Sequence, residues 1–213
     1  MTDPTEIAKN LRKPEGATGK QIGEFMNKGN IHSYNRMKEH LKYNATSKVL
    51  EIGFGNGLTS KEIMCACKYV GLDYSADMVA EAKILCAKEV NECGSELLLG
   101  DVHAMPFANE SFDVIFTINT IHFWDKPEQA VSELRRVLKK GGKLLIGMRT
   151  KEDMELLSVF TQYGFNIRSL GTVEELLRAG GFSEIKYTVY SDPLNQRADG
   201  SFQQLHSVVF EAQ

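Results

Sequence analysis

The sequence lacks any long apolar run. Its unbroken apolar stretches span only a few residues, far below the ~20 that a membrane-spanning helix needs. The first ten residues, MTDPTEIAKN, are polar and have no apolar core of the kind found in signal peptides. These two absences predict a soluble, cytoplasmic protein with no membrane span.

An excess of basic charge is also missing, because 25 Lys and Arg are balanced by 28 Asp and Glu. Nucleic-acid binding depends on clustered cations that neutralise phosphates. The charge balance therefore argues against a nucleic-acid partner, and it leaves the oligomeric state open.

Cysteine is scarce, and the four that are present fall in a stretch predicted to be mostly helical: Cys65, Cys67, Cys86 and Cys93. Cys65 and Cys67 are two residues apart, which points them to different faces of a helix and makes them poor metal ligands. We expect reduced thiols that pack as small apolar residues, with a thiol site for a soft metalloid substrate as the alternative. The histidines are scattered along the chain, so no metal site is expected.

The length and composition are those of one globular domain. With 213 residues, of which 42% are hydrophobic, the chain can bury a full core without disulfides or metals. We expect a single domain over residues 1–213. Its predicted parts are an N-terminal helical cap at 1–46, a core at 47–150 that carries the motifs below, and C-terminal helices and closing strands at 151–213.

Apolar strands alternate with helix-length segments in the core, which predicts an α/β fold with a parallel sheet. Strands are expected at 48–52, 69–73, 96–100, 112–119 and 143–148, with helices at 58–67, 75–91 and 126–139. Lys139 and Lys140 are expected to end the last of these helices. Further on, the expected elements are helices at 152–162 and 172–179 and strands at 184–190 and 206–211. Residues 1–16 are expected to be loosely ordered, and a helix is expected on either side of Gly29 and Asn30.

Three glycines, Gly53, Gly55 and Gly57, follow the first core strand in VLEIGFGNG. A strand, a glycine-rich turn and a helix form the arrangement in which a nucleotide-like ligand lies against bare backbone at a helix N-terminus. The third glycine comes one residue earlier than in the dinucleotide fingerprint G-x-G-x-x-G. Glu51, at the end of the strand, would repel a pyrophosphate and attract an ammonium group.

Two further acids end the next two strands: Asp73 in VGLDYS and Asp101 in LLLGDVHAMPF. An acid at the position of Asp73 accepts hydrogen bonds from a ribose diol. The ends of neighbouring parallel strands line one crevice, so the three acids are expected to converge there. They describe a ligand with an amino group, a diol and an adenine amine but no phosphate, which fits S-adenosylmethionine.

In these residues the sequence resembles the class I S-adenosylmethionine-dependent methyltransferases, in particular the small-molecule branch that includes the ubiquinone and menaquinone C-methyltransferases. The resemblance rests on VLEIGFGNG, VGLDYSADMVAEA, GDVHAMPFANESFDVIF and SELRRVLKKGGKLLI. It implies a Rossmann-like, doubly wound, mostly parallel sheet of seven strands with an antiparallel C-terminal strand. It also implies transfer of a methyl group to a small organic acceptor.

The same resemblance implies roles for the residues of the cofactor site. The three glycines would form the cofactor loop, Asp73 would hold the ribose, and Tyr74 would lie beside the adenine. Asp101 and the Val102 backbone would bind the adenine edge, and Asn119 would lie near the methionine part.

Further candidates lie next to these motifs. The Phe54 ring is expected to stabilise the sulfonium cation, and His103 to contact the cofactor or its loop. His122, three residues after the fourth strand, is the candidate general base over the crevice, with a structural role in the loop as the alternative. The surface for the acceptor is expected to be apolar, with core packing as the alternative role for its residues: Phe25, Met26, Tyr34 and Trp124.

Other functions remain open on the sequence. A nicotinamide-dependent reductase would have the same strand, glycine-rich turn and helix and the same ribose-binding acid. Its third glycine, however, would come later in the loop. A module that binds S-adenosylmethionine without catalysis would carry the same motifs. Structural alternatives also remain, namely a ligand-free turn for the glycines, a helix cap for Asp73 and a turn residue for Asp101.

Overall fold

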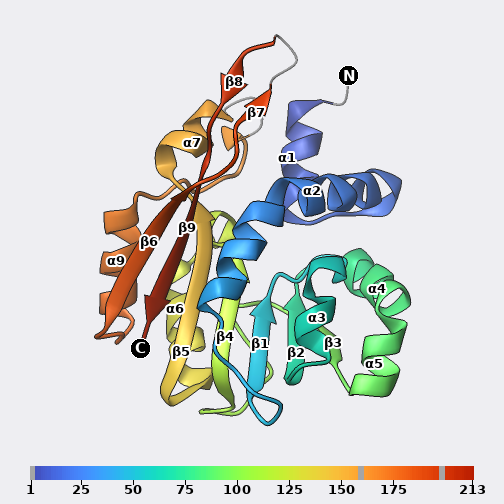
Figure 1. The fold of residues 1–213 in the computed structure, drawn as a ribbon, viewed down its shortest axis with the longest axis vertical. Coiled ribbons are helices and arrows are strands. Elements are labelled where there is room, and N and C mark those ends of the chain that lie inside the picture. The colour runs from blue at the N-terminus through green and yellow to red at the C-terminus, as the bar shows by residue number, and fades with distance from the viewer. Residues whose placement is uncertain (1–2, 158–160, 197–199) are drawn as a thin grey trace.

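The computed structural model describes residues 3–157, 161–196 and 200–213. Within these residues, seven strands form one sheet in the order β3-β2-β1-β4-β5-β9-β6 (Figure 1). Neighbouring strands from β3 to β5 are parallel, and β9 lies antiparallel between β5 and β6. This confirms the predicted fold class. The strands are β1 (Lys48–Ile52), β2 (Lys68–Asp73), β3 (Glu96–Leu99), β4 (Phe112–Ile118), β5 (Leu138–Arg149), β6 (Ile185–Ser191) and β9 (His206–Ala212).

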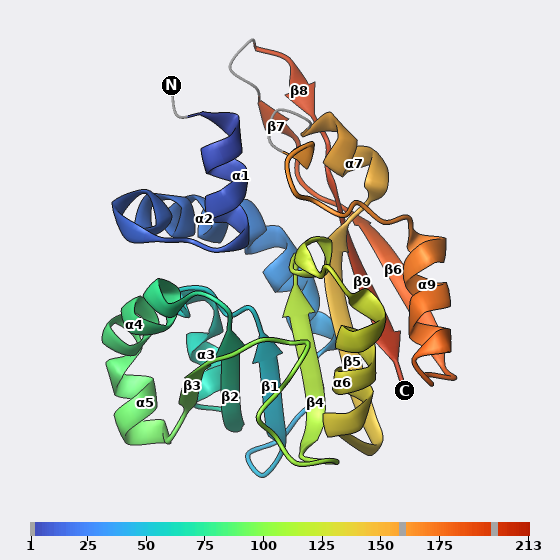
Figure 2. The same ribbon diagram turned by 180° about the vertical axis from the view of Figure 1, so that it is seen from behind.

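Helices cover both faces of the sheet, with α6 and α9 on one face and α2, α3 and α4 on the other (Figure 2). Two short strands, β7 (Asn195–Gln196) and β8 (Phe202–Gln203), pair with each other in a separate antiparallel sheet. Among the described residues, no helix combines the length and the apolar character needed to cross a membrane. The helices are α1 (Pro4–Arg12), α2 (Gly16–His40), α3 (Lys61–Met64), α4 (Ala76–Leu85), α5 (Ala87–Cys93), α6 (Pro127–Val137), α7 (Lys151–Leu156) and α9 (Leu170–Ala179), with short 3-10 turns η1 (Leu58–Ser60) and η2 (Ile121–Phe123).

The helices α1 and α2, which we call the cap helices, extend above the C-terminal ends of β1, β2 and β4 (Figures 1 and 2). The predicted loose N-terminus is wrong, because Asp3 accepts a hydrogen bond from the Thr5 N–H and starts α1. The predicted break at Gly29 and Asn30 is also wrong. Gly29 O accepts a hydrogen bond from the Arg149 side chain, and the Asn30 side chain is hydrogen-bonded too, so tertiary contacts outweigh weak helix propensity.

Some predicted boundaries also need correction. Lys139 and Lys140 belong to β5 rather than to the end of α6, because the chain enters the sheet as soon as the helix ends. The single helix expected at 75–91 is two helices that meet at Cys86. The helix expected at 152–162 is the shorter α7, and residues 158–160 of that prediction lie outside the described residues.

The expectation of four reduced thiols is wrong for two of them. Cys65 and Cys93 form a disulfide with a Cα–Cα distance of 5.2 Å. This is possible because α3 ends at Met64, so that Cys65 lies in the following turn and faces the end of α5. Cys67 and Cys86 are free and buried, as predicted, and burial raises the pKa of Cys67 to about 11.

Candidate active site

A pocket of about 480 Å³ lies between the cap helices and the C-terminal ends of β1, β2 and β4. The chain passes from β1 outward to β3 and then returns to place β4 on the other side of β1. This reversal of strand order is where open α/β sheets form their ligand crevice. The three acids expected to converge all line the pocket: Glu51, Asp73 and Asp101.

The three glycines have left-handed backbone conformations, with φ of +74° at Gly53, +59° at Gly55 and +75° at Gly57. A Cβ on Gly53 would lie 2.4 Å from Thr120 Cγ2, and one on Gly57 would lie 2.9 Å from Cys86 Sγ. At Gly55 no described atom lies within 4 Å of that position, and Gly55 lines the pocket. Two glycines therefore permit close packing of the loop, while Gly55 leaves open space for a ligand.

Glu51 is only 2% exposed at the end of β1, and hydroxyl groups surround its carboxylate. Tyr69 and Ser60 each donate a hydrogen bond to it at 2.6 Å. The Tyr34 hydroxyl donates to Ser60 at 2.7 Å and lies 3.3 Å from both Glu51 oxygens. Burial raises the pKa of Glu51 to about 7, although the hydroxyl hydrogen bonds act in the opposite direction. The site thus holds a carboxyl group that titrates near neutral pH beside the pocket.

Asp73 supports the glycine loop directly. Its carboxylate accepts hydrogen bonds from the backbone N–H groups of Gly55 and Ser75, each at 2.8 Å. Burial raises its pKa to about 6 in spite of these bonds. The N-cap of α4 is Ser75, whose Oγ accepts a hydrogen bond from the Met78 N–H. The cap role considered for Asp73 is therefore filled by Ser75.

Asp101 forms a local turn at the edge of the pocket. Its Oδ1 accepts a hydrogen bond from the His103 N–H at 2.9 Å and lies 2.6 Å from His103 Nδ1. Asp101, Val102 and His103 all line the pocket. His103 Nε2 is buried and has no hydrogen-bond partner in the described residues. The turn role considered for Asp101 is therefore compatible with a place at the ligand.

The remaining cofactor candidates, Phe54, Tyr74 and Asn119, also line the pocket. Tyr74 is 53% exposed, with Lys13 Nζ 5.4 Å from its ring centre. Phe54 is buried, and its ring fits against Gly71, where a Cβ would lie 2.5 Å from the ring. Asn119 directly follows β4 and has φ of +55°.

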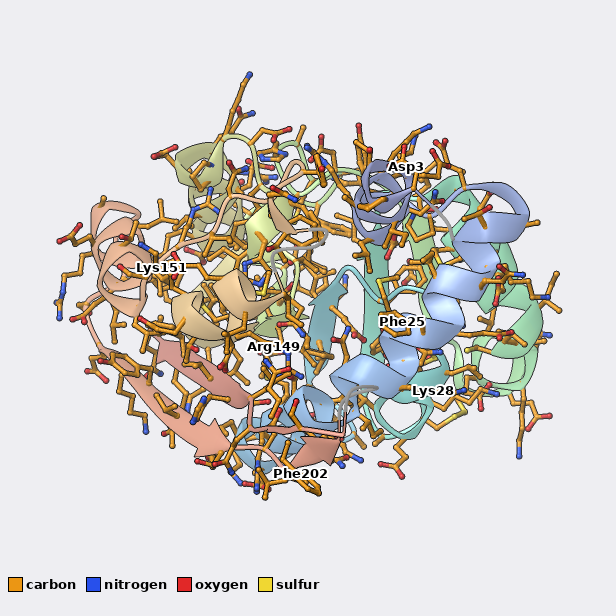
Figure 3. All side chains as sticks on the ribbon, turned by 90° about the horizontal axis from the view of Figure 1, so that it is seen from above. Asp3, Phe25, Lys28, Arg149, Lys151 and Phe202 are labelled. Atoms are coloured by element: carbon orange, nitrogen blue, oxygen red, sulfur yellow. A yellow bond between two sulfur atoms is a disulfide. The ribbon has the colours of Figure 1, made fainter. Side chains whose placement is uncertain are left out.

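Three of the four residues expected at the acceptor lie on the pocket wall: Met26, Tyr34 and Trp124. Phe25 is not on the wall; it is 58% exposed on α2, which Figure 3 shows from above. Adjacent helical positions point about 100° apart, so Met26 faces the pocket and Phe25 does not. The structure therefore places Phe25 outside the expected acceptor surface.

His122 does not lie over the crevice as predicted. It is 2% exposed in η2, it is not among the residues that line the pocket, and a Phe165 ring lies 6.4 Å from its own. Burial, with smaller contributions from Arg168 and Arg149, lowers its pKa to about 4. An uncharged, enclosed imidazole fits the structural alternative, because a general base must reach the proton that it takes.

Three residues of α2 that were not predicted at the site line the pocket at helical spacing with the predicted Tyr34: Gly23, Asn27 and Asn30. Asn27 donates a hydrogen bond to Asn56 in the glycine loop at 2.9 Å. Asn30 accepts one from Asn119 at 2.8 Å. The repeat of small and polar residues at this spacing is the signal that could have identified this face of α2, but the expected helix break divided it.

Residues 50–146 match the model of a family described as a methyltransferase domain. An uncharacterized protein, MJ1123, of Methanocaldococcus jannaschii is 32% identical over 148 residues, which are 65% of this chain and 66% of that protein. A malonyl-[acyl-carrier protein] O-methyltransferase of Methylococcus capsulatus is 28% identical over 149 residues, which are 66% of this chain and 53% of that protein. The chain spans 45% to 66% of the length of the first curated relatives that it matches.

Among solved structures, the phosphoethanolamine N-methyltransferase 2 of Haemonchus contortus, in complex with phosphomonomethylethanolamine and S-adenosylhomocysteine, has a TM-score of 0.71 to this chain. The match has 19% identity and covers 97% of this chain and 60% of that chain, so it shows the fold alone. The segment that matches the methyltransferase-domain model contains the glycine loop and the three acids. Residues 50–146 therefore match a methyltransferase domain, and the fold of the chain is similar to that of S-adenosylmethionine-dependent methyltransferases.

Proposed function

We propose that the protein transfers a methyl group from S-adenosylmethionine to a small organic acceptor. The observation that carries this proposal is the single pocket wall on which an open glycine loop and three strand-end carboxylates meet beneath the cap helices. The carboxylates offer acceptors for an ammonium group, a ribose diol and an adenine amine.

The chain's own residues fit this cofactor. Gly55 leaves space beside bare backbone, and Asp73, already fixed by two N–H groups, keeps lone pairs for the ribose hydroxyls. Glu51 would hold the ammonium group, and Asp101 with the Val102 backbone would hold the adenine edge. When bound, the cofactor supplies a methyl group already activated on a sulfonium, so the protein needs no nucleophile of its own.

Pyrophosphate-containing cofactors fit the same wall poorly. Glu51 is a buried carboxyl group next to the glycine loop, where its ionised form would repel a diphosphate. A nicotinamide-dependent reductase is therefore disfavoured by the charges of the site as well as by the spacing of the glycines.

The cap helices would orient the reactants and exclude water. They are held over the pocket by polar contacts at its rim, which include the Arg12–Asp125 ion pair and a hydrogen bond from Ser75 Oγ to Pro14 O at 2.6 Å. Enclosure of this kind keeps reacting groups aligned, which can contribute several kcal/mol to a two-substrate reaction.

The size of the pocket, about 480 Å³, also supports the proposal that the acceptor is a small molecule. The likeness to the ubiquinone and menaquinone C-methyltransferases is part of the same proposal, but it rests on cofactor motifs. Those motifs carry no information about the acceptor atom, which depends on the wall at the end of β4.

The proposed function is tested by release of S-adenosylhomocysteine from S-adenosylmethionine across a panel of small amines, alcohols, thiols and carbon acids. We expect turnover that an Asp73→Ala variant loses together with cofactor binding. Tight binding of S-adenosylhomocysteine without turnover on any acceptor would instead identify a cofactor-binding module.

A further inference from the structure

A disulfide at the surface lies close to the glycine loop and takes no part in the proposed methyl transfer. Cys65 and Cys93, which form this bridge, are both exposed. Cys65 lies in the turn that ends α3, and η1 and α3 directly follow the glycine loop in the chain. Cys93 is the last residue of α5. Because an exposed bridge can be attacked by a thiolate from solution, its state can follow the redox conditions around the protein.

The other end of α5 contacts the glycine loop itself. Cys86 is the residue before α5, and its thiol lies 3.9 Å from the carbonyl oxygen of Asn56. A Cβ on Gly57 would lie only 2.9 Å from the same sulfur. Asn56 also lines the pocket. The loop, η1, α3, the bridge and α5 therefore form a closed ring that begins and ends at the cofactor site.

Few contacts besides the bridge hold α5 in this ring. None of its seven residues is buried, although Val90 packs partly buried against the core. An ion pair joins Lys61 to Glu89 at 3.8 Å. An isolated helix of this length is unstable in water, so α5 depends on its attachments at both ends. Ser95 Oγ donates a hydrogen bond to Met64 O at 2.7 Å, which keeps the two cysteines near each other when the bridge is open. Opening the bridge should therefore loosen α5 and still allow the bridge to form again.

We propose that the Cys65–Cys93 pair is a redox switch that sets cofactor affinity, with a dithiol as its reductant. This inference rests on the proposed use of S-adenosylmethionine. The closed bridge holds the glycine loop in its binding conformation, and the protein with the open bridge binds the cofactor more weakly.

The exchange takes place in two steps. One thiolate of the dithiol attacks a bridge sulfur, the S–S bond breaks, and the other cysteine leaves as a thiolate that takes up a proton. The second thiolate of the reductant then attacks the mixed disulfide, closes the reductant's own S–S bond and releases the first cysteine as a thiol. The dithiol is oxidised, and the bridge gains its two electrons and two protons.

Calorimetry with S-adenosylhomocysteine on oxidised protein and on protein reduced with dithiothreitol tests the inference. A thiol assay after denaturation should detect two thiols before reduction and four after it, because only Cys67 and Cys86 are free. We expect affinity to fall about tenfold on reduction, within the usual range of coupling between two sites, and to return on reoxidation. A Cys65→Ser, Cys93→Ser double variant should bind as weakly as the reduced protein and not respond to dithiothreitol.

The coupling acts in both directions. If reduction weakens binding about tenfold, saturating S-adenosylhomocysteine makes the bridge about tenfold harder to reduce. For a two-electron couple this corresponds to a potential lower by about 30 mV, which thiol counting in dithiothreitol redox buffers can measure. Cys67→Ser is the matched control, because Cys67 lines the same surface pocket as both bridge cysteines without being part of the bridge. It should change neither the affinity nor its response to reduction.

Equal affinity in the oxidised and reduced protein would overturn the inference, even if reduction lowers the melting temperature, because the bridge would then stabilise the fold alone. Four thiols in protein kept under oxidising conditions would overturn it as well. Failure of the proposed function is distinguishable, because S-adenosylhomocysteine then gives no heat in either redox state, and the inference fails with it. A lack of turnover on every acceptor would leave the difference in binding intact.

Discussion

Glu51 keeps a carboxyl group inside the protein at the end of β1, where burial raises its pKa from 4.5 to about 7. The folded state therefore favours the neutral form, and this contribution to stability is lost as the pH rises from about 4.5 to about 7. The shift corresponds to roughly 3 kcal/mol. We predict that Glu51→Gln raises the melting temperature of the ligand-free protein at pH 8 and has little effect at pH 4. Equal effects at both pH values would show that charge burial is not the cause.

The same ionisation should act in the opposite direction on cofactor binding. An ionised Glu51 attracts the cofactor ammonium group, so affinity for S-adenosylhomocysteine should rise between pH 6 and pH 8, by up to about tenfold per unit below the pKa. Asp73, with a pKa of about 6, adds to the rise at the lower end. Calorimetry at several pH values measures this directly. Glu51→Gln should bind more weakly at pH 8 and lose most of the dependence, and a flat profile in the parent protein would contradict the assignment.

Gly55 and Gly57 give a matched pair of substitutions within one loop. Both have positive φ, so an alanine at either position costs about 1 kcal/mol of backbone strain. A Cβ at Gly57 also meets Cys86, whereas one at Gly55 enters the space reserved for the cofactor. We predict that Gly57→Ala mainly lowers the melting temperature and that Gly55→Ala mainly weakens cofactor binding. The reverse pattern in melts and calorimetry would show that the loop does not hold the ligand as described.

At the scale of elements, α2 is coupled to the cofactor site through Tyr34. The Tyr34 hydroxyl lowers the pKa of Glu51, so its removal should raise that pKa further. We predict that Tyr34→Phe moves the pH midpoint of cofactor binding upward. Tyr190→Phe is a suitable control. The hydroxyl of Tyr190, on β6, lies 2.6 Å from Nε2 of His40 on α2, and neither residue lines the pocket. A shift of equal size in both variants would indicate a general loosening of α2.

The disulfide between Cys65 and Cys93 joins the turn after α3 to the end of α5. It closes a loop with a sequence separation of 28, for which the chain-entropy model gives about 3.6 kcal/mol of stability. Reduction with dithiothreitol should therefore lower the melting temperature. A Cys65→Ser, Cys93→Ser double variant should start at the lower value and not respond to the reductant. An unchanged melt on reduction of the parent would show that the bridge contributes little.

The elements that sequence reasoning predicted well are those with local signals. The glycine loop and the acids at the ends of β1 and β2 follow from spacing, because backbone conformation and strand ends are local properties. The continuous α2 could not be predicted in this way, since Asn30 is held by Asn119, which is distant in the sequence. The burial of His122 was missed for the same reason, because it depends on Phe165 and other residues that pack around η2.

At the scale of the whole molecule, the alternation of strands and helices predicted a parallel α/β sheet and the edge at which the site forms, while the seven strands and the antiparallel C-terminal strand followed from the family resemblance. The division into one domain with a cap, a core and a C-terminal part stays a prediction. The cap is the part that the sequence described least well, and it supplies the contacts that distinguish this pocket: Asn27, Asn30 and Tyr34. These are tertiary contacts, which local sequence patterns do not encode.

Titration calorimetry of the purified protein with S-adenosylhomocysteine at pH 8, repeated with NADH, tests the central claim most directly. We predict binding of one equivalent of S-adenosylhomocysteine, loss of that heat in Asp73→Ala, and no comparable heat with NADH. Binding of NADH by a protein that gives no heat with S-adenosylhomocysteine would contradict it.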